Sequence, residues 1–594
     1  MVGCMLAVTA FAKGSDLKIE HLSDNHTLVR VNTDKRYVLL PIQDTAPESS
    51  VNVITDSKSD EILQIRLAMN RVDYYVPFDL SAYKGKAVLL DVIQQAGRES
   101  IRNAKGDACW KEIKSSETFD ASNREKYRLS YHFSPAYGWM NDPNGMVYKD
   151  GVYHLFYQHN PYGSMWGNLS WGHATSKDLI NWEHRPVALL PDALGAIFSG
   201  SAVVDKDNTA GFGAGAIVAM YTSAGVSQTQ SLAYSTDNGN TFKKYALNPV
   251  ITDNVPDFRD PKMFWNEDIR KWNLVLAAGQ EVKFYSSPNL KDWTYESSFG
   301  HGYGNHGGVW ECPDLIKLPV KGTGKSKWVL LLNINPGGPF GGSATQYFTG
   351  DYDGHKFVCD SKPETTKWMD YGKDHYAAVT WSNAPEGRHI ALAWMSNWQY
   401  ANDVPTKQFR SSNSVPRDLS LYEENGEIYL TSTPSSELLA LRGKLECSMS
   451  FSVGKTKDVK NFLKNNAGTY EILVSLQSYN AKVFGLALSN EKGEKVVMTY
   501  NLKEKTFSMD RSKSGLTDFS KDFPAETKAP LDGAANYTLR LLVDKSSIEA
   551  FDGAGKFCMT NLVFPTDVFN NLSFFTKDGR YKVTNLKIYP LNVK

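Results

Sequence analysis

The chain has 594 residues. At roughly 150 residues per domain this is too long for one hydrophobic core and predicts three or four domains. Its 65 lysines and arginines balance its 65 aspartates and glutamates. A formal charge of zero gives no overall field that would attract nucleic acid or an anionic membrane, so we expect a neutral partner.

Residues 1–13 have the pattern of a signal-peptide remnant. An apolar run from Cys4 to Phe11 ends in Ala10-Phe11-Ala12, the small-x-small pattern of a signal-peptidase site. A lipoprotein modified at Cys4 is the alternative, which the apolar residues after Cys4 disfavour. No later stretch approaches the roughly 18 consecutive apolar residues of a membrane helix. We therefore expect an exported protein, periplasmic or extracellular, without a transmembrane segment.

Residues 14–120 predict a small β-rich domain. Short apolar runs such as Tyr37–Leu40 and Ala87–Leu90 alternate with Gly, Asp, Ser and Lys, as strands and turns do. The hydrophilic segment Lys111–Lys126 follows, and we interpret it as a linker. This domain contains no recognisable cluster of catalytic residues.

A weak internal repeat predicts a five-bladed β-propeller over residues 126–430. Ser176–Trp182 recurs as Ser287–Trp293, in altered form as Ser235–Phe242, and more loosely as Gly350–Phe357. Successive copies lie about 50 to 60 residues apart, somewhat above the four-stranded blade repeat. Long helical periodicity is missing, which favours an all-β chain.

Residues 434–594 predict a C-terminal β-sandwich. Alternating strands such as Tyr470–Leu476 and Tyr537–Val543 recur at regular spacing with turns between them.

The cysteines and histidines do not form metal-binding motifs. The six cysteines include no Cys-x-x-Cys pair, and His173, His184 and His306 lack helical or hairpin ligand spacing. We expect neither a metal nor a cofactor.

Three short acidic strings are the strongest functional signal. They are Trp139–Gly145, Arg259–Pro261 and Trp310–Pro313, and each places a carboxylate beside a proline or one residue short of it. A proline biases the residue before it towards extended geometry, which we expect for Asp142 and Asp260. A single Asp-Pro pair usually marks a turn or a strand end. Three such strings, two of them with a tryptophan, favour the paired carboxylates that cleave glycosidic bonds.

In their order along the chain, these strings and several others resemble glycoside hydrolase family 32, the β-fructofuranosidases. The resemblance covers about residue 131 to the C-terminus and rests on Trp139–Gly145, Phe156–Pro161, Trp166-Gly167, Trp171–Ala174, Phe198–Ser201, Phe258–Pro261, Trp310–Asp314, Trp398–Ala401 and, in the sandwich, Ser546–Phe551. It implies an all-β fold in which a five-bladed propeller precedes a β-sandwich. The N-terminal β-rich domain is an addition to that pattern.

The resemblance also implies a role for each carboxylate. Asp142 would be the nucleophile and Glu311 the acid and base, with the two carboxyl groups about 5 to 5.5 Å apart as in retaining enzymes. Glu311 would need a raised pKa, which a partly desolvated wall that includes Trp310 could provide. Asp260 would stabilise the charged transition state, with Arg259 helping to keep it ionised.

The same resemblance implies the substrate-binding residues. Asn141, Gln158 and Ser199 would bind sugar hydroxyls, and tryptophans would form an aromatic rim. The full predicted set is Asn141, Gln158, Ser199, Trp139, Trp166, Trp398, Phe198, Arg259 and Asp374. His375 stands where the family commonly has phenylalanine, which puts finer specificity in doubt.

The implied function is exo-acting, retaining hydrolysis of terminal β-D-fructofuranosyl units from levan or inulin, and from sucrose. An endo-levanase and a fructosyltransferase are the alternatives within the family. A non-catalytic fructan-binding protein is the alternative from another class, and the complete set of Asp142, Asp260 and Glu311 argues against it. The preference for β-2,6 or β-2,1 linkages and the oligomeric state are not predicted.

Overall fold

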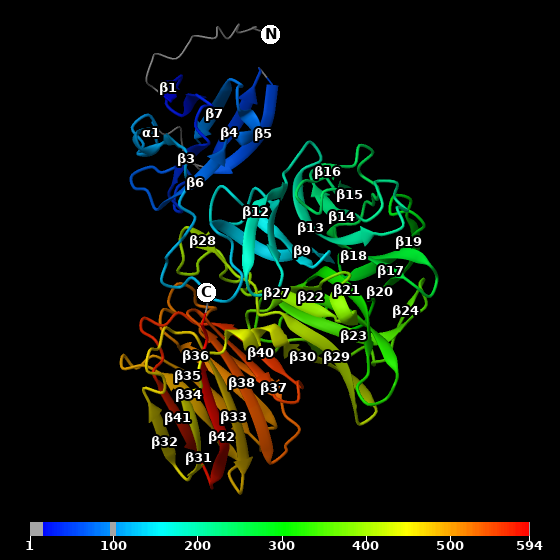
Figure 1. The fold of residues 1–594 in the computed structure, drawn as a ribbon, viewed down its shortest axis with the longest axis vertical. Coiled ribbons are helices and arrows are strands. Elements are labelled where there is room, and N and C mark those ends of the chain that lie inside the picture. The colour runs from blue at the N-terminus through cyan, green and yellow to red at the C-terminus, as the bar shows by residue number, and fades with distance from the viewer. Residues whose placement is uncertain (1–15, 57, 95–102, 593–594) are drawn as a thin grey trace.

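The computed structural model describes residues 16–56, 58–94 and 103–592, so the predicted signal remnant at 1–13 lies outside the described residues. The chain forms three successive β-structures, which confirms the all-β prediction (Figure 1). The helical elements are short: α1 (Cys109–Glu112) and the 3-10 turns η1 (Ser81–Tyr83), η3 (Pro385–Gly387) and η4 (Ser436–Leu441). Over the described ranges, none of the helices could span a bilayer.

The N-terminal part packs two sheets around one core of Val, Leu and Ile side chains. The first sheet has the order β1 (Leu17–His21), β2 (His26–Val31), β7 (Val88–Gln94), β4 (Ser49–Thr55) and β5 (Lys58–Ile65). The second has the order β6 (Tyr74–Asp79), β3 (Tyr37–Ile42) and β8 (Lys114–Ser116). Because β8 pairs with β3, the prediction of a linker from residue 111 is wrong in its first part.

The middle part is a propeller of five sheets. The first blade consists of β9 (Gly138–Lys149), β10 (Val152–Asn160), β11 (Ser170–Ser176) and β12 (Trp182–Leu189), and the second of β13 (Ala196–Asp205), β14 (Ala216–Ala224), β15 (Gln228–Ser235) and β16 (Lys243–Lys244). The third blade consists of β17 (Phe258–Asn266), β18 (Lys271–Ala278), β19 (Glu281–Ser287) and β20 (Thr294–Phe299), and the fourth of β21 (Val309–Pro319), β22 (Ser326–Asn335), β23 (Ala344–Tyr352), β24 (Phe357–Cys359) and β25 (Lys367–Trp368). The fifth blade consists of β26 (Tyr376–Thr380), β27 (Ile390–Trp394), β29 (Arg417–Glu424) and β30 (Glu427–Pro434). Strand β28 (Phe409–Arg410) adds to β9 in parallel. The first strand of each blade neighbours that of the next, and β26 neighbours β9, so the ring is closed.

The repeated sequence segments occupy equivalent places in four blades. Each lies between the third and fourth strands of its blade. In all four the side chain of an Asp or Asn accepts a hydrogen bond from a backbone N–H three or four residues later, which closes the turn; these residues are Asp178, Asp237, Asn289 and Asp353. The repeat therefore marks the blades, as predicted.

The first strand of every blade contains a register shift. The shifts lie between Met140 and Pro143 and between Asn144 and Val147 in β9, between Ile197 and Gly200 in β13, between Arg259 and Lys262 in β17, between Glu311 and Asp314 in β21 and between Tyr376 and Val379 in β26. Such bulges turn a strand locally and redirect its side chains. Because they lie around one channel, these shifts bring side chains of all five blades to the same region.

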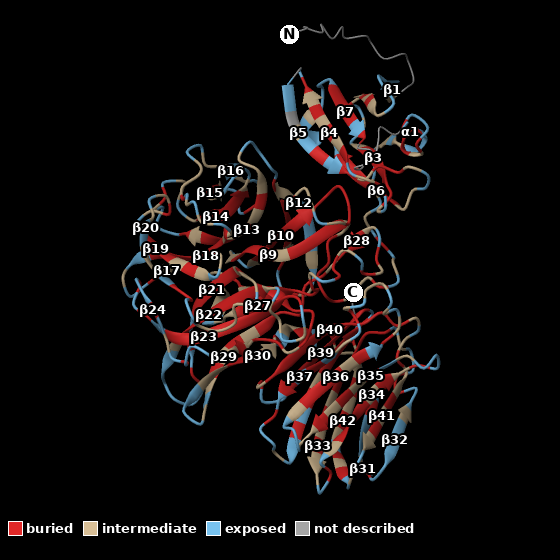
Figure 2. Cartoon of the chain, turned by 180° about the vertical axis from the view of Figure 1, so that it is seen from behind, coloured by how far each residue is buried: buried red, intermediate tan, exposed pale blue. Residues whose placement is uncertain are grey.

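The C-terminal part is a sandwich of two six-stranded sheets. One has the order β31 (Cys447–Val453), β42 (Tyr581–Pro590), β33 (Tyr470–Ser478), β38 (Asn536–Asp544), β39 (Ser547–Asp552) and β40 (Cys558–Leu562), and the other β32 (Thr456–Lys460), β41 (Asn571–Thr576), β34 (Val483–Ser489), β35 (Lys495–Asn501), β36 (Thr506–Lys513) and β37 (Glu526–Pro530). Their facing side chains form one apolar core, and buried residues alternate with exposed ones along the strands (Figure 2).

Candidate active site

Each of the five blades contributes at least one polar side chain to a single cluster. Asp142 comes from β9, Ser199 from β13, Asp260 from β17, Glu311 from β21 and Tyr376 from β26. Hydrogen bonds between these strands join the cluster, so the structure brings the three predicted carboxylates together. The bulges position them, since Asp260 lies within one and Glu311 and Tyr376 immediately precede others.

Hydrogen-bond donors orient the carboxylate of Asp142. The hydroxyl of Ser199 donates to Oδ2 at 2.6 Å, and the amide of Asn141 donates to Oδ1 at 3.0 Å. Asn141 is itself fixed, because Nε1 of the fully buried Trp139 donates to its Oδ1 at 2.8 Å. The predicted residues Asn141, Ser199 and Trp139 therefore support Asp142 directly or through one another.

Glu311 is held by two donors and keeps 20% of its side-chain surface exposed. Nε and Nη2 of Arg259 both donate to Oε1, at 3.1 and 2.9 Å, and the hydroxyl of Tyr376 donates to Oε2. Burial raises the pKa of Glu311 and the negative charge of Asp142 adds to this, whereas Arg259 and Tyr376 lower it. The pKa remains raised, which suits an acid that must be protonated near neutral pH.

Arg259 acts on Glu311 in addition to its predicted effect on Asp260, whose pKa its charge lowers. Its guanidinium bonds to Glu311 and, through Nη1, to Asp257 at 2.6 Å, and none of its hydrogen bonds reaches Asp260. Arg259 therefore orients the carboxyl of Glu311 and influences Asp260 only through its charge.

Asp260 is 5% exposed and has a raised pKa. Burial is the largest cause, and the charges of Glu311 and Asp142 add to it, while Arg259 and the Cys312 N–H oppose it. Its φ is +68°, so the expectation of extended geometry before proline is wrong here. The bulge in β17 imposes the left-handed conformation, which aspartate tolerates better than most residues.

Two members of the cluster were missed by the sequence analysis. The Cys312 thiol lies between the two aspartates, with Sγ 3.3 Å from Oδ2 of Asp142 and 3.5 Å from Oδ2 of Asp260. Burial and the surrounding carboxylates raise the pKa of Cys312 well above its ordinary value, so the group stays a thiol and donates. Tyr376 was the other. Cys312 lies inside the string Trp310–Pro313, but no local pattern predicts its role or that of Tyr376, because both roles depend on contacts between blades.

The predicted aromatic residues lie at two depths. Trp398 is half-buried and stacks on Trp139, with ring centres 5.9 Å apart and planes 26° apart. Trp166 is 44% exposed and contacts the half-buried Phe198 edge-on at 6.4 Å. Phe198 directly precedes Ser199, so these rings stand next to the carboxylate cluster.

Gln158 lies on the second strand of the first blade and is 1% exposed. When the side-chain amide of Asn144 is oriented so that its oxygen faces Gln158, the Gln158 side-chain amide donates to that oxygen at 2.9 Å. The oxygen Oε1 of Gln158 has no hydrogen-bond partner among the described residues. Its predicted contact with sugar remains a prediction.

The prediction that Asp374 binds substrate is wrong, because the structure places this residue outside the site. The residue is fully buried between propeller and sandwich. Its Oδ1 accepts from the Tyr400 hydroxyl at 2.6 Å, and its Oδ2 accepts from Arg511 and from the Leu562 N–H. With both oxygens bonded inside the protein, Asp374 stabilises the interface and has no surface for a substrate.

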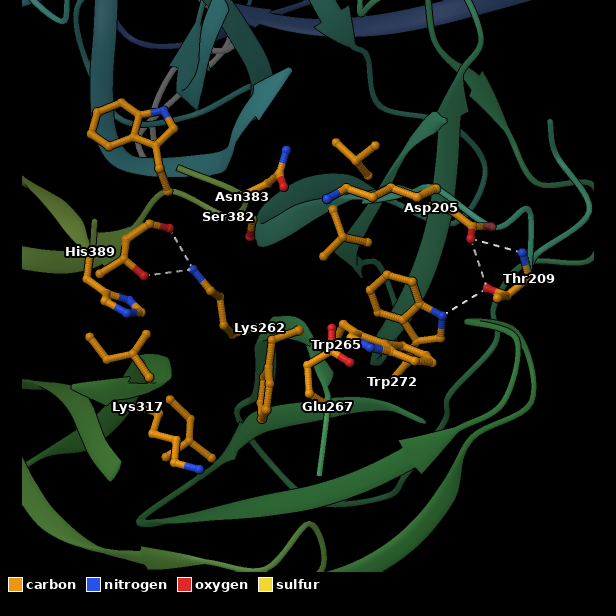
Figure 3. Close-up of a pocket in the computed structure, with 18 of the residues that line it drawn as sticks. Asp205, Thr209, Lys262, Trp265, Glu267, Trp272, Lys317, Ser382, Asn383 and His389 are labelled. Carbon is orange, nitrogen blue, oxygen red and sulfur yellow. Dashed lines mark hydrogen bonds between the residues drawn. The ribbon is translucent and has the colours of Figure 1, made fainter. Parts of the chain in front are cut away.

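The channel below the carboxylates is nearly closed. A space of about 20 Å³ is lined by Ser199, Asp260 and Cys312, and further down by Lys262 and Thr380. Nζ of Lys262 donates to the Thr380 carbonyl at 2.6 Å and pairs with Asp314 at 2.9 Å. A larger cavity of about 430 Å³ opens beyond them (Figure 3), and none of the three carboxylates lines it. The large cavity is therefore separate from the candidate site.

The described residues contain no group of three His, Cys, Asp or Glu side chains suited to a metal ion. The expectation of a metal-free enzyme stays a prediction.

A closed propeller with carboxylates from different blades in one channel, two of them with raised pKa values, is the arrangement of a glycoside hydrolase. Residues 132–434 match the profile of the Glycosyl hydrolases family 32 N-terminal domain, and residues 437–590 match that of the Glycosyl hydrolases family 32 C terminal. Residues 23–131 match a Domain of unknown function (DUF4980).

Curated and solved relatives agree with these matches. The chain is 46% identical to a levanase of Bacillus subtilis over 480 residues, which cover 79% of this chain and 71% of the levanase. It is 40% identical to an extracellular exo-inulinase of Aspergillus niger over 75% of this chain and 90% of the relative. The crystal structure of an exo-inulinase from Aspergillus awamori matches with a TM-score of 0.75 and 36% identity, over 79% of this chain and 99% of that one. The chain belongs to glycoside hydrolase family 32.

Proposed function

We propose that this protein is an exo-acting, retaining β-fructosidase that removes terminal β-D-fructofuranosyl units from levan or inulin, and also cleaves sucrose. The observation that carries the proposal is the unequal environment of its two carboxyls. Asp142 is surrounded by donors that orient it, whereas Glu311 is partly buried with a raised pKa. Similarity to a levanase and to exo-inulinases supports fructans as the substrate class.

In the proposed mechanism Asp142 attacks the anomeric carbon of the terminal fructosyl unit while Glu311 gives its proton to the departing oxygen. A covalent fructosyl-enzyme and a shortened chain result. Glu311, now a carboxylate, takes a proton from water, and the hydroxide equivalent releases fructose from Asp142 with the anomeric configuration retained. Asp260 binds sugar hydroxyls and stabilises the positive charge that develops on the ring.

The exo mode is supported by the similarity of the chain to exo-inulinases. Export to the periplasm or the cell exterior is part of the proposal and is supported by the extracellular relatives.

Product analysis on levan, inulin and sucrose over time tests the mode of action. Free fructose as the first product supports the proposal. A ladder of oligosaccharides would establish an endo-levanase, lengthened chains a fructosyltransferase, and binding without any released sugar a fructan-binding protein.

The Asp142→Asn variant tests the nucleophile. We expect hydrolysis to fall by roughly a thousandfold or more, because the amide cannot form the covalent intermediate, while the unfolding midpoint stays close to that of the wild type. Full activity would refute the assignment. Proton NMR of the first product is the second check, and inversion at the anomeric carbon would exclude Asp142 and Glu311 as nucleophile and acid.

A further inference from the structure

The N-terminal part contacts the propeller at the segment that carries Trp166. This segment, residues 161–169, joins β10 to β11. It contains Gly163 and Gly167, and glycines allow a loop more conformations than other residues do. Something outside the loop must therefore fix the indole of Trp166, which projects 44% exposed beside Phe198.

Ser164, two residues before Trp166, is completely buried and held by two partners. The hydroxyl of Tyr74 in β6 accepts from the Ser164 N–H at 2.9 Å and bonds to the Ser164 hydroxyl at 2.9 Å. Tyr74 in turn donates to Asp44 at 2.6 Å. The buried Arg410 donates to the Ser164 carbonyl at 3.0 Å and pairs with Asp44 at 3.5 Å. Every polar group of Ser164 is thus engaged, and Tyr74 and Asp44 belong to the N-terminal part.

Asn168, two residues after Trp166, is held in the same way. Its side-chain amide pairs with the backbone of Gln64 in β5, accepting from the N–H at 2.9 Å and donating to the carbonyl at 2.8 Å. Its φ is +43°, a conformation that asparagine tolerates. The two anchors at Ser164 and Asn168 form a clamp that encloses Trp166.

We propose that the N-terminal part, which matches a domain of unknown function, serves to fix this clamp and so pre-positions Trp166 as a wall of the substrate funnel. Ordering a flexible loop costs conformational entropy. When the loop is ordered before substrate arrives, that cost is removed from binding. The clamp therefore acts on substrate affinity, and this proposal rests on the proposed function.

Tyr74→Phe tests the clamp, with Tyr75→Phe as the matched control. Both changes remove one phenol hydroxyl from β6, but that of Tyr75 bonds to Glu112 within the N-terminal part. In Tyr74→Phe we expect KM on levan or inulin to rise about three- to tenfold with kcat within about twofold, because a lost hydrogen bond weakens positioning and leaves the carboxylates untouched. Tyr75→Phe should match the wild type. Equal KM values for the two variants would overturn the proposal.

The double variant Tyr74→Phe/Trp166→Ala shows whether the effect of Tyr74→Phe on KM depends on the indole of Trp166. If it does, Tyr74→Phe has no further effect on KM once Trp166 is gone, so the two changes are not additive. Additive changes would show that the N-terminal part acts elsewhere and would refute the proposal.

Hydrogen exchange separates this proposal from the proposed function. The backbone amides of residues 162–168 should exchange faster in Tyr74→Phe than in Tyr75→Phe, without any substrate present. Unchanged exchange refutes the clamp even if the enzyme releases fructose. Faster exchange in a protein that does not cleave fructans would instead refute the proposed function and leave the structural role of the clamp in place.

Discussion

At the scale of single residues, the pKa of Glu311 is set by opposing effects. Burial raises it, whereas the guanidinium of Arg259 and the hydroxyl of Tyr376 favour the charged carboxylate and lower it. The balance matters because Glu311 must be an acid in the first step and a base in the second. Arg259 and Tyr376 therefore both lower the pKa of Glu311, each through a hydrogen bond to a different carboxyl oxygen.

Tyr376→Phe should move the alkaline limb of the pH profile of kcat/KM to higher pH. Removal of the hydroxyl takes away a donor that stabilises the carboxylate, so the pKa of Glu311 rises and the acid stays protonated further into the alkaline range. At its optimum kcat/KM should fall about ten- to a hundredfold, as expected for one hydrogen bond to a charged group. Initial rates from pH 4 to 9 provide the check, and a limb that moves to lower pH would contradict this account.

The sequence predicted single residues well where the chemistry is local to a motif. Asp142, Asp260 and Glu311 lie in short strings that a proline, and in two cases a tryptophan, makes recognisable in the sequence. The structure brings all three carboxylates together. Cys312 and Asp374 show the limit. The thiol of Cys312 contacts an aspartate from another blade of the propeller. Asp374 pairs with Arg511, which lies 137 positions away in the sandwich. No local pattern contains either contact.

At the scale of elements, the bulges direct polar side chains from five β-sheets into one active site. Asp260 in β17 and Cys312 in β21 both have positive φ and both precede a proline. Proline alone favours extended geometry for such residues, so tertiary structure overrides the local preference at both positions. The repeated turns were readable because they are local, whereas the bulges and the short strand β8 depend on pairing with other strands.

Asp260→Asn and Asp260→Ala should separate the backbone role of this bulge from its chemistry. Both variants lose most of the activity, because neither carries the carboxylate. Asparagine tolerates φ near +68° and still accepts from the Cys312 N–H, whereas alanine does neither. We expect the alanine variant to be less stable than the asparagine variant by about 1–3 kcal/mol in urea denaturation. Equal stability would show that the bulge imposes no strain at this position.

At the scale of the whole molecule, a buried ionic network joins the propeller to the sandwich. His132 donates from both ring nitrogens, from Nδ1 to Asp544 at 2.9 Å and from Nε2 to Glu549 at 2.8 Å. Glu549 then pairs with Arg417 at 2.5 Å, and Arg417 with Asp370 at 2.8 Å. All five side chains are at most 1% exposed, so each charge depends on its partners for stabilisation.

This network makes the stability of the protein depend on pH through His132. Burial alone would lower the pKa of His132, but the hydrogen bonds and charges of Asp544 and Glu549 raise it to about 9. The folded protein therefore holds a proton that the unfolded chain, with a pKa of 6.5, has released. The contribution is complete below pH 6.5 and is lost as pH rises through 9. The neighbouring Tyr131 does not titrate in this window, because burial raises its pKa well above 10.0.

The contribution of His132 to the free energy of unfolding, measured as the difference between wild type and His132→Gln, should fall by about 3 kcal/mol between pH 6.5 and 9, at about 1.4 kcal/mol per pKa unit. His132→Gln should lose this slope and be less stable by about 3–5 kcal/mol at pH 6.5, because Asp544 and Glu549 then share one cation fewer. His355→Gln is the matched control. Its pair with Glu296 is solvent-exposed, with His355 at 51%, so we expect a change of less than about 1 kcal/mol. Urea denaturation followed by tryptophan fluorescence at pH 6.5, 7.5 and 9 measures all three proteins. If His132→Gln retained the wild-type slope, the proton taken up on folding would have to reside elsewhere, and the ionic network could not be the source of the pH dependence.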